Sequence, residues 1–203
     1  MESQNQHSAS APQKATDAVE NIINHYYAES PELRRILLKH SRCVADKALD
    51  IARRHPELNL NEDFLEAAAM LHDIGIIRCD APSICCHGSE HYICHGREGA
   101  KMLRVLSGTP LIDDKYIEPL ARICERHTGA GLSRAEILAQ NLPLPAQDFL
   151  PETTAEQVVC YADKFFSKTH LDHEKTVEEA ARSLKKFGSD GLSRFTEWVE
   201  RFE

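Results

Sequence analysis

The chain has 203 residues, of which 42% are hydrophobic and 28% charged, so it can bury a sizeable core and is neither a disordered nor a fibrous protein. It carries 24 basic and 32 acidic residues, and the resulting net charge of −8 opposes non-specific binding to nucleic acid or anionic lipid. The negative net charge does not exclude a small phosphorylated ligand, because a metal ion or a few Arg and Lys side chains within the binding site could bind its phosphate.

The N-terminal segment, residues 1–14, is polar and without apolar periodicity, so we expect a mobile tail. It lacks the basic and apolar regions of a secretory signal, and no run of about eighteen apolar residues occurs in the chain. The seven cysteines are an odd number scattered through helical sequence, which indicates reduced thiols rather than a disulfide framework. We therefore expect a cytoplasmic protein.

The residue pattern from 15 to 203 is helical almost throughout, with breaks at Gly and Pro, and predicts one all-α domain without a convincing sheet. After a first helix, a second is predicted to begin with Ser30 as N-cap and Pro31 as first residue, and to end near His55. His40 falls on the apolar face of this helix, so its side chain is expected to point inward.

A third helix is predicted between Asn61, its N-cap, and Gly75, its left-handed C-cap. His72 and Asp73 lie at the end of this helix and are expected to face the core. An irregular stretch from 76 to 94 follows.

The next two predicted helices are joined by a short break. One runs from about 96 to 106, and the other has Asp114 as its N-cap. Apolar residues at three- and four-residue spacing place His127 at the inward C-terminal end of the second of these helices.

The remaining predicted helices follow a proline-containing loop. Thr154 is the expected N-cap of a helix that carries Asp163 on its apolar face. Two amphipathic helices, at about 174–187 and 189–202, then complete the domain.

Four histidines and two aspartates therefore lie on inward helix faces or at inward helix ends. One buried histidine is usually satisfied by a backbone carbonyl, but six such residues together need another explanation. A divalent cation would neutralise the carboxylates and use the imidazole lone pairs, and mixed imidazole and carboxylate ligands suit iron, manganese or zinc. The six residues are His40, His72, Asp73, His95, His127 and Asp163.

The order of these residues resembles that of the HD-domain metal-dependent phosphohydrolases, whose ligands follow one another as H…HD…H…H…D. The similarity spans about residues 30–170 and includes His72-Asp73-Ile74-Gly75, His95-Gly96-Arg97-Glu98-Gly99-Ala100, Arg126-His127-Thr128-Gly129 and Tyr161-Ala162-Asp163-Lys164. In motif context the chain looks most similar to the bacterial HDIG-type proteins that include dinucleoside tetraphosphate hydrolases. This resemblance implies a single-domain orthogonal helical bundle.

The resemblance also implies a role for each residue. His40, His72, Asp73 and Asp163 would hold one divalent ion, and Asp73, His95 and His127 a second, with Fe, Mn, Zn, Ni, Co or Mg as the metal. The implied activity is hydrolysis of a phosphate ester or anhydride of a nucleotide or small metabolite. Two such ions, about 3.5–4 Å apart, would activate a water for attack, with Asp73 as the shared catalytic carboxylate.

Lys164 directly follows a predicted ligand and is a candidate catalytic residue that clamps the substrate phosphate. Arg97, Lys101 and Arg126 are further candidates for substrate binding, with a solvated surface charge as the alternative for each. His91 is a candidate that faces either substrate or solvent.

The stretch from 79 to 95 leaves two questions open. Its four cysteines and three histidines could form a separate zinc site, but paired C-x₂₋₄-C spacing is absent, so an irregular lid with incidental thiols is favoured. His91 precedes His95 by four residues and would share its helical face. We favour His95 as the third histidine ligand because Gly-x-x-Gly-Ala follows it directly.

Two other functions compete with hydrolysis of a small phosphorylated substrate. A related branch of the same fold uses the same six ligands around two irons as an oxygenase. A non-catalytic nucleotide-binding module is the third hypothesis. The acidic balance gives no reason to expect nucleic acid or a membrane as partner.

Overall fold

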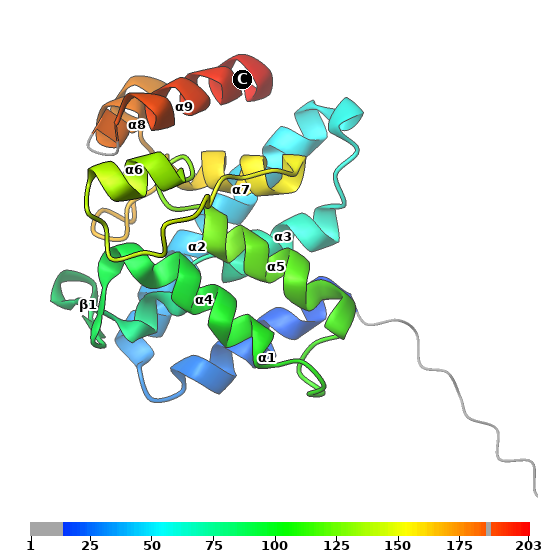
Figure 1. Ribbon diagram of the computed structural model, residues 1–203. Helices are drawn as coiled ribbons and strands as arrows, with labels where there is room; N and C mark the ends of the chain where they lie inside the picture. Colours follow the sequence, from blue (N-terminus) through cyan, green and yellow to red (C-terminus); the bar gives the residue numbers. More distant parts are fainter. Residues whose placement is uncertain (1–13, 186–187) are drawn as a thin grey trace, which may run out of the picture.

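The computed structural model describes residues 14–185 and 188–203, and these ranges contain nine α-helices, which confirms the all-α fold (Figure 1). The first five helices in chain order are α1 (Ala15–Tyr27), α2 (Pro31–Arg54), α3 (Glu62–Leu71), α4 (His95–Arg104) and α5 (Asp114–Arg126). The others are α6 (Arg134–Ala139), α7 (Thr154–Asp163), α8 (Val177–Leu184) and α9 (Ser189–Phe202). The division into a tail and one domain stays a prediction.

The long helix α2 has the predicted ends. Ser30 is its N-cap, Pro31 is its first residue, and His55 follows its last residue as C-cap. A proline suits the first helical position because the N–H that it lacks would have no partner inside the helix. The inward face packs against α3 and α7, and His40 lies on it with 1% exposure, as the apolar spacing predicted.

Of the four predicted N-caps, Ser30 and Asn61 are confirmed and the other two are wrong by one residue. The Asn61 side chain accepts a hydrogen bond from the Phe64 N–H at the start of α3. The cap of α5 is Asp113 rather than Asp114, and that of α7 is Thr153 rather than Thr154. In both cases two neighbouring residues have side chains that can cap a helix. The first of the two has an extended backbone conformation, as an N-cap requires, so it is the cap.

Gly75 does not end α3 in a left-handed conformation, so that prediction is wrong. It lies inside a 3₁₀ helix, η2 (Ile74–Arg78), and is needed for close packing instead. A Cβ atom at Gly75 would lie 2.1 Å from the His95 carbonyl oxygen and 2.2 Å from the Gly99 nitrogen. The glycine therefore lets the chain after Asp73 touch the backbone of α4.

The stretch from 76 to 94 contains more regular structure than the sequence predicted. Its 3₁₀ turns are η3 (Pro82–Ile84) and η4 (Tyr92–Cys94), and its strands are β1 (Cys79–Ala81), β2 (Cys86–His87) and β3 (Glu90–His91). β1 lies between the other two, antiparallel to β2 and parallel to β3. Strands of two or three residues are too short to leave an alternating pattern in the sequence.

A second missed element is the short helix α6, within the segment expected to be a loop. Ser133 and Glu136 form a capping box at its start, which is the sequence signal that could have revealed it. Helix α6 packs beside a small separate apolar cluster of Leu132, Ile137 and Phe149.

The two C-terminal helices were predicted correctly in number and order within the described residues. They lie together beyond α7 (Figure 1), and α8 is shorter than the predicted 174–187. Residues 186–187 lie outside the described residues, as do residues 1–13 of the predicted tail. Phe195 and Phe202 of α9 pack against the Tyr161 ring of α7, which joins this pair of helices to the core.

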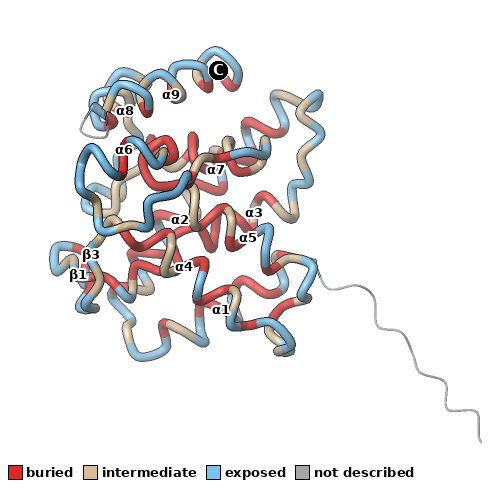
Figure 2. Tube along the Cα trace, in the orientation of Figure 1, coloured by how far each residue is buried: buried red, intermediate tan, exposed pale blue. Residues whose placement is uncertain are grey.

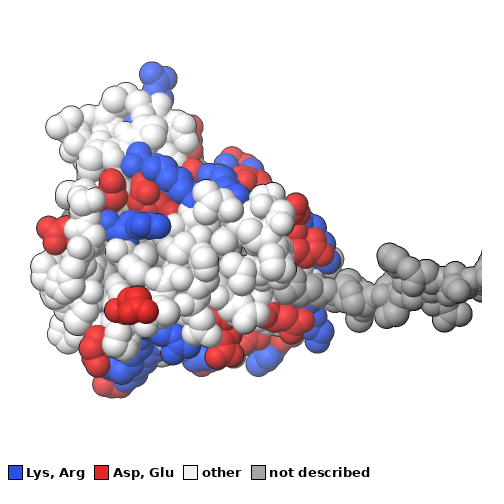
Figure 3. Space-filling view, turned by 90° about the horizontal axis from the view of Figure 1, so that it is seen from below, with Lys and Arg blue, Asp and Glu red and all other residues white. Residues whose placement is uncertain are grey.

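Buried residues line the inward sides of the helices around α2, α4, α5 and α7 (Figure 2). Outside this core, charged side chains form mixed groups of both signs around a largely uncharged centre on the face seen in Figure 3. Ion pairs among the charged side chains of the described residues include Arg104 with Glu118 and Arg122 with Glu152. In the described part of the chain, no helix combines the length and the apolar character that crossing a membrane requires.

Candidate metal centre

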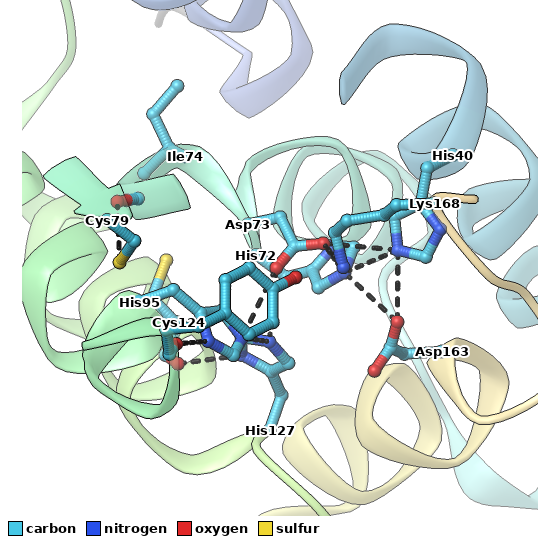
Figure 4. Close-up of polar contacts among 12 residues, drawn as sticks. His40, His72, Asp73, Ile74, Cys79, His95, Cys124, His127, Asp163 and Lys168 are labelled. Carbon is cyan, nitrogen blue, oxygen red and sulfur yellow. Dashed lines mark hydrogen bonds and ion pairs between the residues drawn. The ribbon is translucent and has the colours of Figure 1, made fainter. Parts of the chain in front are cut away.

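Six side chains from five helical segments converge in the core of the bundle (Figure 4). The contributing positions are the middle of α2 (His40), the end of α3 (His72 and Asp73), the first residue of α4 (His95), the end of α5 (His127) and the last residue of α7 (Asp163). All are buried except Asp163, which is partly exposed. The structure thus brings together all six residues that the sequence singled out.

The first group surrounds one carboxylate oxygen of Asp73. Its Oδ2 lies 3.1 Å from His40 Nε2 and 3.1 Å from His72 Nε2. The Asp163 Oδ1 atom is 3.0 Å from His40 Nε2 and 3.5 Å from His72 Nε2. Four potential ligand atoms therefore lie within 4.8 Å of one another.

The second group surrounds the other oxygen of the same carboxylate. Asp73 Oδ1 is 3.4 Å from His95 Nε2 and 3.4 Å from His127 Nε2. The two imidazole nitrogens are 2.9 Å apart. Asp73 thus directs one oxygen to each group.

Three of the imidazoles are fixed by backbone carbonyls three residues before them. Nδ1 of His72 donates to the Ala69 carbonyl at 2.6 Å, Nδ1 of His95 to Tyr92 and Nδ1 of His127 to Cys124, both at 2.7 Å. The Ala69 and Cys124 carbonyls lie in the last turns of α3 and α5, where carbonyls lack intrahelical N–H partners, whereas the Tyr92 carbonyl also accepts from the His95 backbone N–H. A carbonyl can only accept, so Nδ1 carries the proton and Nε2 offers its lone pair to the site.

This donor set fits a cation. Lone pairs of His95 and His127 face each other and the Asp73 carboxylate, an arrangement that repels unless a positive ion or a proton lies between them. Among the described residues, moreover, neither carboxylate oxygen of Asp73 has a partner with hydrogen-bond geometry, although both are buried. Imidazole and carboxylate ligands suit first-row divalent metals.

Burial and neighbouring charges shift the titration of these groups. Burial and the neighbouring His127 lower the pKa of His95 to about 3, so this imidazole is neutral. Burial alone would raise the pKa of Asp73, but the Lys168 ammonium and His72 hold it well below its usual range. For His72, burial lowers the pKa, yet the Asp73 charge and carboxylate hydrogen bonds raise it to about 9, and a bound metal ion would displace this proton.

The HD domain model matches residues 37–168, which is more than half of the chain. The chain belongs to the HD domain family. This membership places it in a superfamily of metal-dependent phosphohydrolases, and the convergence of His and Asp side chains fits a metal site in such a domain.

Relatives of this HD domain include proteins with different names. A tRNA (cytidine(56)-2'-O)-methyltransferase of Picrophilus torridus is 31% identical over 74% of the chain, and one of Thermoplasma volcanium 32% over 64%. The matches span only 40% and 32% of those two proteins. An uncharacterized protein of Methanocaldococcus jannaschii is 29% identical over 74% of the chain and 78% of its own length. No solved structure matches.

Two lysines lie beside the ligand set of the HD domain. Lys164 Nζ is 2.7 Å from Asp163 Oδ2 and donates to the His127 carbonyl at 2.9 Å. Lys168 Nζ is 2.5 Å from Asp73 Oδ2. The two ammonium groups balance the two carboxylate charges of the site.

A pocket of about 690 Å³ opens next to these residues. Its wall includes His95, His127, Asp163, Lys164, Lys168 and Tyr92. The volume is typical of small-molecule sites, and the groups at the site end are polar or basic.

The other predicted substrate-binding residues lie elsewhere, except for His91. Arg97 and Lys101 form ion pairs with Glu98, and Arg126 pairs with Glu152 and Glu156. The pocket wall contains none of these three basic residues. Arg97 and Arg126 are largely enclosed by these contacts and Lys101 is exposed, and a role of the three in substrate binding stays a prediction.

Of His91 and His95, only His95 lies in the second group of side chains around Asp73. His91 is exposed, caps the turn η4 by accepting from the Ile93 N–H, and lines the pocket without facing Asp73. His95 joins the second group, as the Gly-x-x-Gly-Ala context predicted.

The cysteine-rich stretch holds no third metal group. In residues 14–185 and 188–203, the two groups around Asp73 are the only His, Cys, Asp and Glu sets compact enough to share an ion. All seven cysteines are free, as predicted. Burial raises the pKa of Cys79 to about 12 and of Cys86 to about 11, so both thiols stay protonated and are poor metal ligands.

Sequence reasoning missed Lys168 and Tyr92. Lys168 follows Asp163 by five residues, beyond the end of α7, so no helical spacing connects the two. The Tyr92 ring stacks on His95 with centroids 4.8 Å apart, and Tyr92 lines the pocket together with Lys168. A basic residue shortly after a predicted ligand was the only signal for Lys168, and Tyr92 gave none.

Proposed function

We propose that this HD domain hydrolyses a phosphate ester or anhydride of a nucleotide or another small metabolite, with two divalent ions at its centre. One observation carries the proposal: Asp73 turns its two oxygens toward two different pairs of imidazoles, next to a pocket that also contains two ammonium groups. This combination provides both ligands for cations and positive charge for an anionic substrate.

Each ligand has an assigned place in the proposal. His40, His72, Asp73 and Asp163 would hold the first ion, and Asp73, His95 and His127 the second. When bound, two divalent ions supply a water activated for attack and positive charge for the phosphoryl oxygens. The three carbonyl-anchored imidazoles keep their Nε2 atoms directed at the site before any metal arrives, which lowers the cost of assembly.

The Lys164 side chain does not extend freely into the pocket, as a residue that binds the substrate phosphate would be expected to do. Its ammonium is committed to the Asp163 carboxylate and the His127 carbonyl, and the residue is buried. It therefore ties the end of α7 to the end of α5 and positions one ligand of each group. Direct contact of Lys164 with substrate stays a prediction.

The size and charge of the site favour a small substrate over a nucleic-acid chain. A volume of about 690 Å³ accommodates a nucleotide-sized molecule, and the net charge of −8 opposes a long polyanion outside the pocket. The apolar and aromatic side chains of Ile93 and Phe166 in the wall could contact a base or another planar group.

The test is metal analysis of the purified protein, paired with phosphatase and phosphodiesterase assays on nucleotides and small phosphoesters under Mn²⁺, Fe²⁺, Co²⁺, Ni²⁺, Zn²⁺ and Mg²⁺. We expect up to two ions per chain and metal-dependent phosphate release. Bound iron with substrate-dependent oxygen uptake and no phosphate release would replace hydrolysis by the oxygenase reaction. Metal-loaded protein that binds nucleotides without turnover would favour the non-catalytic module.

A further inference from the structure

Lys168 lies in a tight turn between α7 and α8 that closes over the metal centre. Ser167 and His170 pair across this turn, and the Lys168 side chain between them is only 12% exposed. Figure 4 shows the side chain extending past His40 to the Asp73 carboxylate. The turn therefore delivers a buried ammonium to the carboxylate shared by both ligand groups.

The ammonium and a metal ion of the first group require the same oxygen. Lys168 Nζ is 2.5 Å from Asp73 Oδ2, the atom that His40 and His72 approach to 3.1 Å. Two positive charges on one buried oxygen repel strongly because little water screens them. Binding of an ion in the first group therefore weakens the hold of Asp73 on Lys168.

Lys168 also borders the pocket, and Tyr92 belongs to the same wall. Tyr92 is held there by stacking on His95. The Lys168 side chain therefore borders both the Asp73 carboxylate and the space that a substrate would occupy.

Charge balance indicates what the released ammonium would meet. Lys164 and Lys168 already offset Asp73 and Asp163, so two divalent ions would leave the buried site with a large positive excess. A phosphoryl group in the adjoining pocket is an anion that would offset this excess. An ammonium beside it would form charge-assisted hydrogen bonds to its oxygens.

We propose that Lys168 is a phosphate-binding residue that exchanges Asp73 for the phosphoryl group of the substrate when the first metal site fills. The inference rests on the proposed function and adds a residue that makes metal and phosphate binding cooperative. Because such coupling is reciprocal, phosphate should in turn strengthen metal binding.

The test uses the full chain, Mn²⁺ alone and inorganic phosphate as probes, and calorimetric titration of wild type and Lys168→Met. The variant lacks the competing ammonium, so its affinity for Mn²⁺ should rise about tenfold. Its Mn²⁺-loaded form should bind inorganic phosphate roughly tenfold to a hundredfold more weakly, because a hydrogen bond to a charged group is lost. Lys168→Gln, which keeps a polar side chain without the positive charge, takes its place if the Met variant does not fold.

The matched control is Lys101→Met, which removes an exposed lysine outside the pocket and should change neither affinity. Unchanged phosphate binding in Lys168→Met, or weaker Mn²⁺ binding, would overturn the inference, the latter because it would show that the lysine only supports the ligands. Failure of the proposed function is seen separately, as wild-type protein that binds no Mn²⁺ or hydrolyses no phosphoester.

Discussion

The two ligand groups of the metal centre are built in different ways. The first group, with His40 and Asp163, lies where α2, α3 and α7 pack together, and it contains both carboxylates and both nearby ammonium groups. The second group has two imidazoles and shares only the Asp73 carboxylate with the first, through its other oxygen, Oδ1. The side chains of the first group are therefore held mainly by the balance of opposite charges, and those of the second mainly by the positions of the backbone segments that carry them.

Backbone placement in the second group depends on two glycines. Gly75 lets the chain after Asp73 touch the His95 carbonyl, and a Cβ at Gly96 would lie 2.4 Å from the Cys124 carbonyl oxygen. That same carbonyl accepts the hydrogen bond from His127 Nδ1. Three kinds of substitution can therefore be compared. One removes a ligand of both groups, one disturbs the backbone that positions the second group, and one removes a single ligand of the second group.

Replacing the shared carboxylate should have the largest effect because it removes a ligand from both groups. In Asp73→Ala we expect loss of both ions and a fall in turnover on the order of a thousandfold or more. Metal analysis and the phosphatase assay measure these effects, and circular dichroism should show the helical content largely unchanged. Asp50→Ala, an exposed aspartate on α2 paired with Arg54, is the control. Full activity in Asp73→Ala would contradict the mechanism.

The next largest effect is expected from Gly75→Ala. The added Cβ meets backbone atoms of α4 that cannot move aside independently, so the free energy of unfolding should fall by about 3 kcal/mol. Thermal unfolding measures this loss. Gly108→Ala is the matched control, because no atom lies within 4 Å of its added Cβ and only its positive φ of 74° opposes the change. It should cost about 1 kcal/mol.

His127→Ala should separate the two groups. The second group retains one imidazole and Asp73, so we expect the affinity for the second ion to fall by about 10- to 100-fold. The first ion should remain, because none of its four ligands is changed. Titration with Mn²⁺ followed by equilibrium dialysis should give one ion per chain instead of two. Loss of both ions together would show that the groups do not act separately.

The smallest effect is expected from Arg194→Met in α9. The Arg194 guanidinium donates to the Ala130 and Gly131 carbonyls, just after His127, and pairs with the buried Glu136. Its loss should lower the free energy of unfolding by about 1–2 kcal/mol. Arg201→Met, which removes exposed contacts of the same helix with Gln157 and Thr154, should cost less than about 0.5 kcal/mol. If chemical denaturation gave the same loss of unfolding free energy for both variants, Arg194 would not link α9 to the second group.

The sequence predicted much of the fold because the helices carry strong local signals. The start of α2 at Ser30-Pro31 and the cap at Asn61 depend on residues next to each helix end, and both are confirmed. The strands β1 to β3 are held by contacts across the chain rather than by their own composition, so the sequence did not reveal them. The single-residue errors at Asp113 and Thr153 arise where two adjacent residues can both cap a helix.

Periodicity in the sequence placed His40, His127 and Asp163 on inward faces that a bundle must bury together, and the resemblance to HD domains implied that two groups share Asp73. That Gly75 serves close packing and that Lys168 reaches Asp73 emerged only from the tertiary structure. These contacts join segments that are distant in the sequence, and no hydrophobic periodicity connects such segments. Their geometry exists only after the helices have packed.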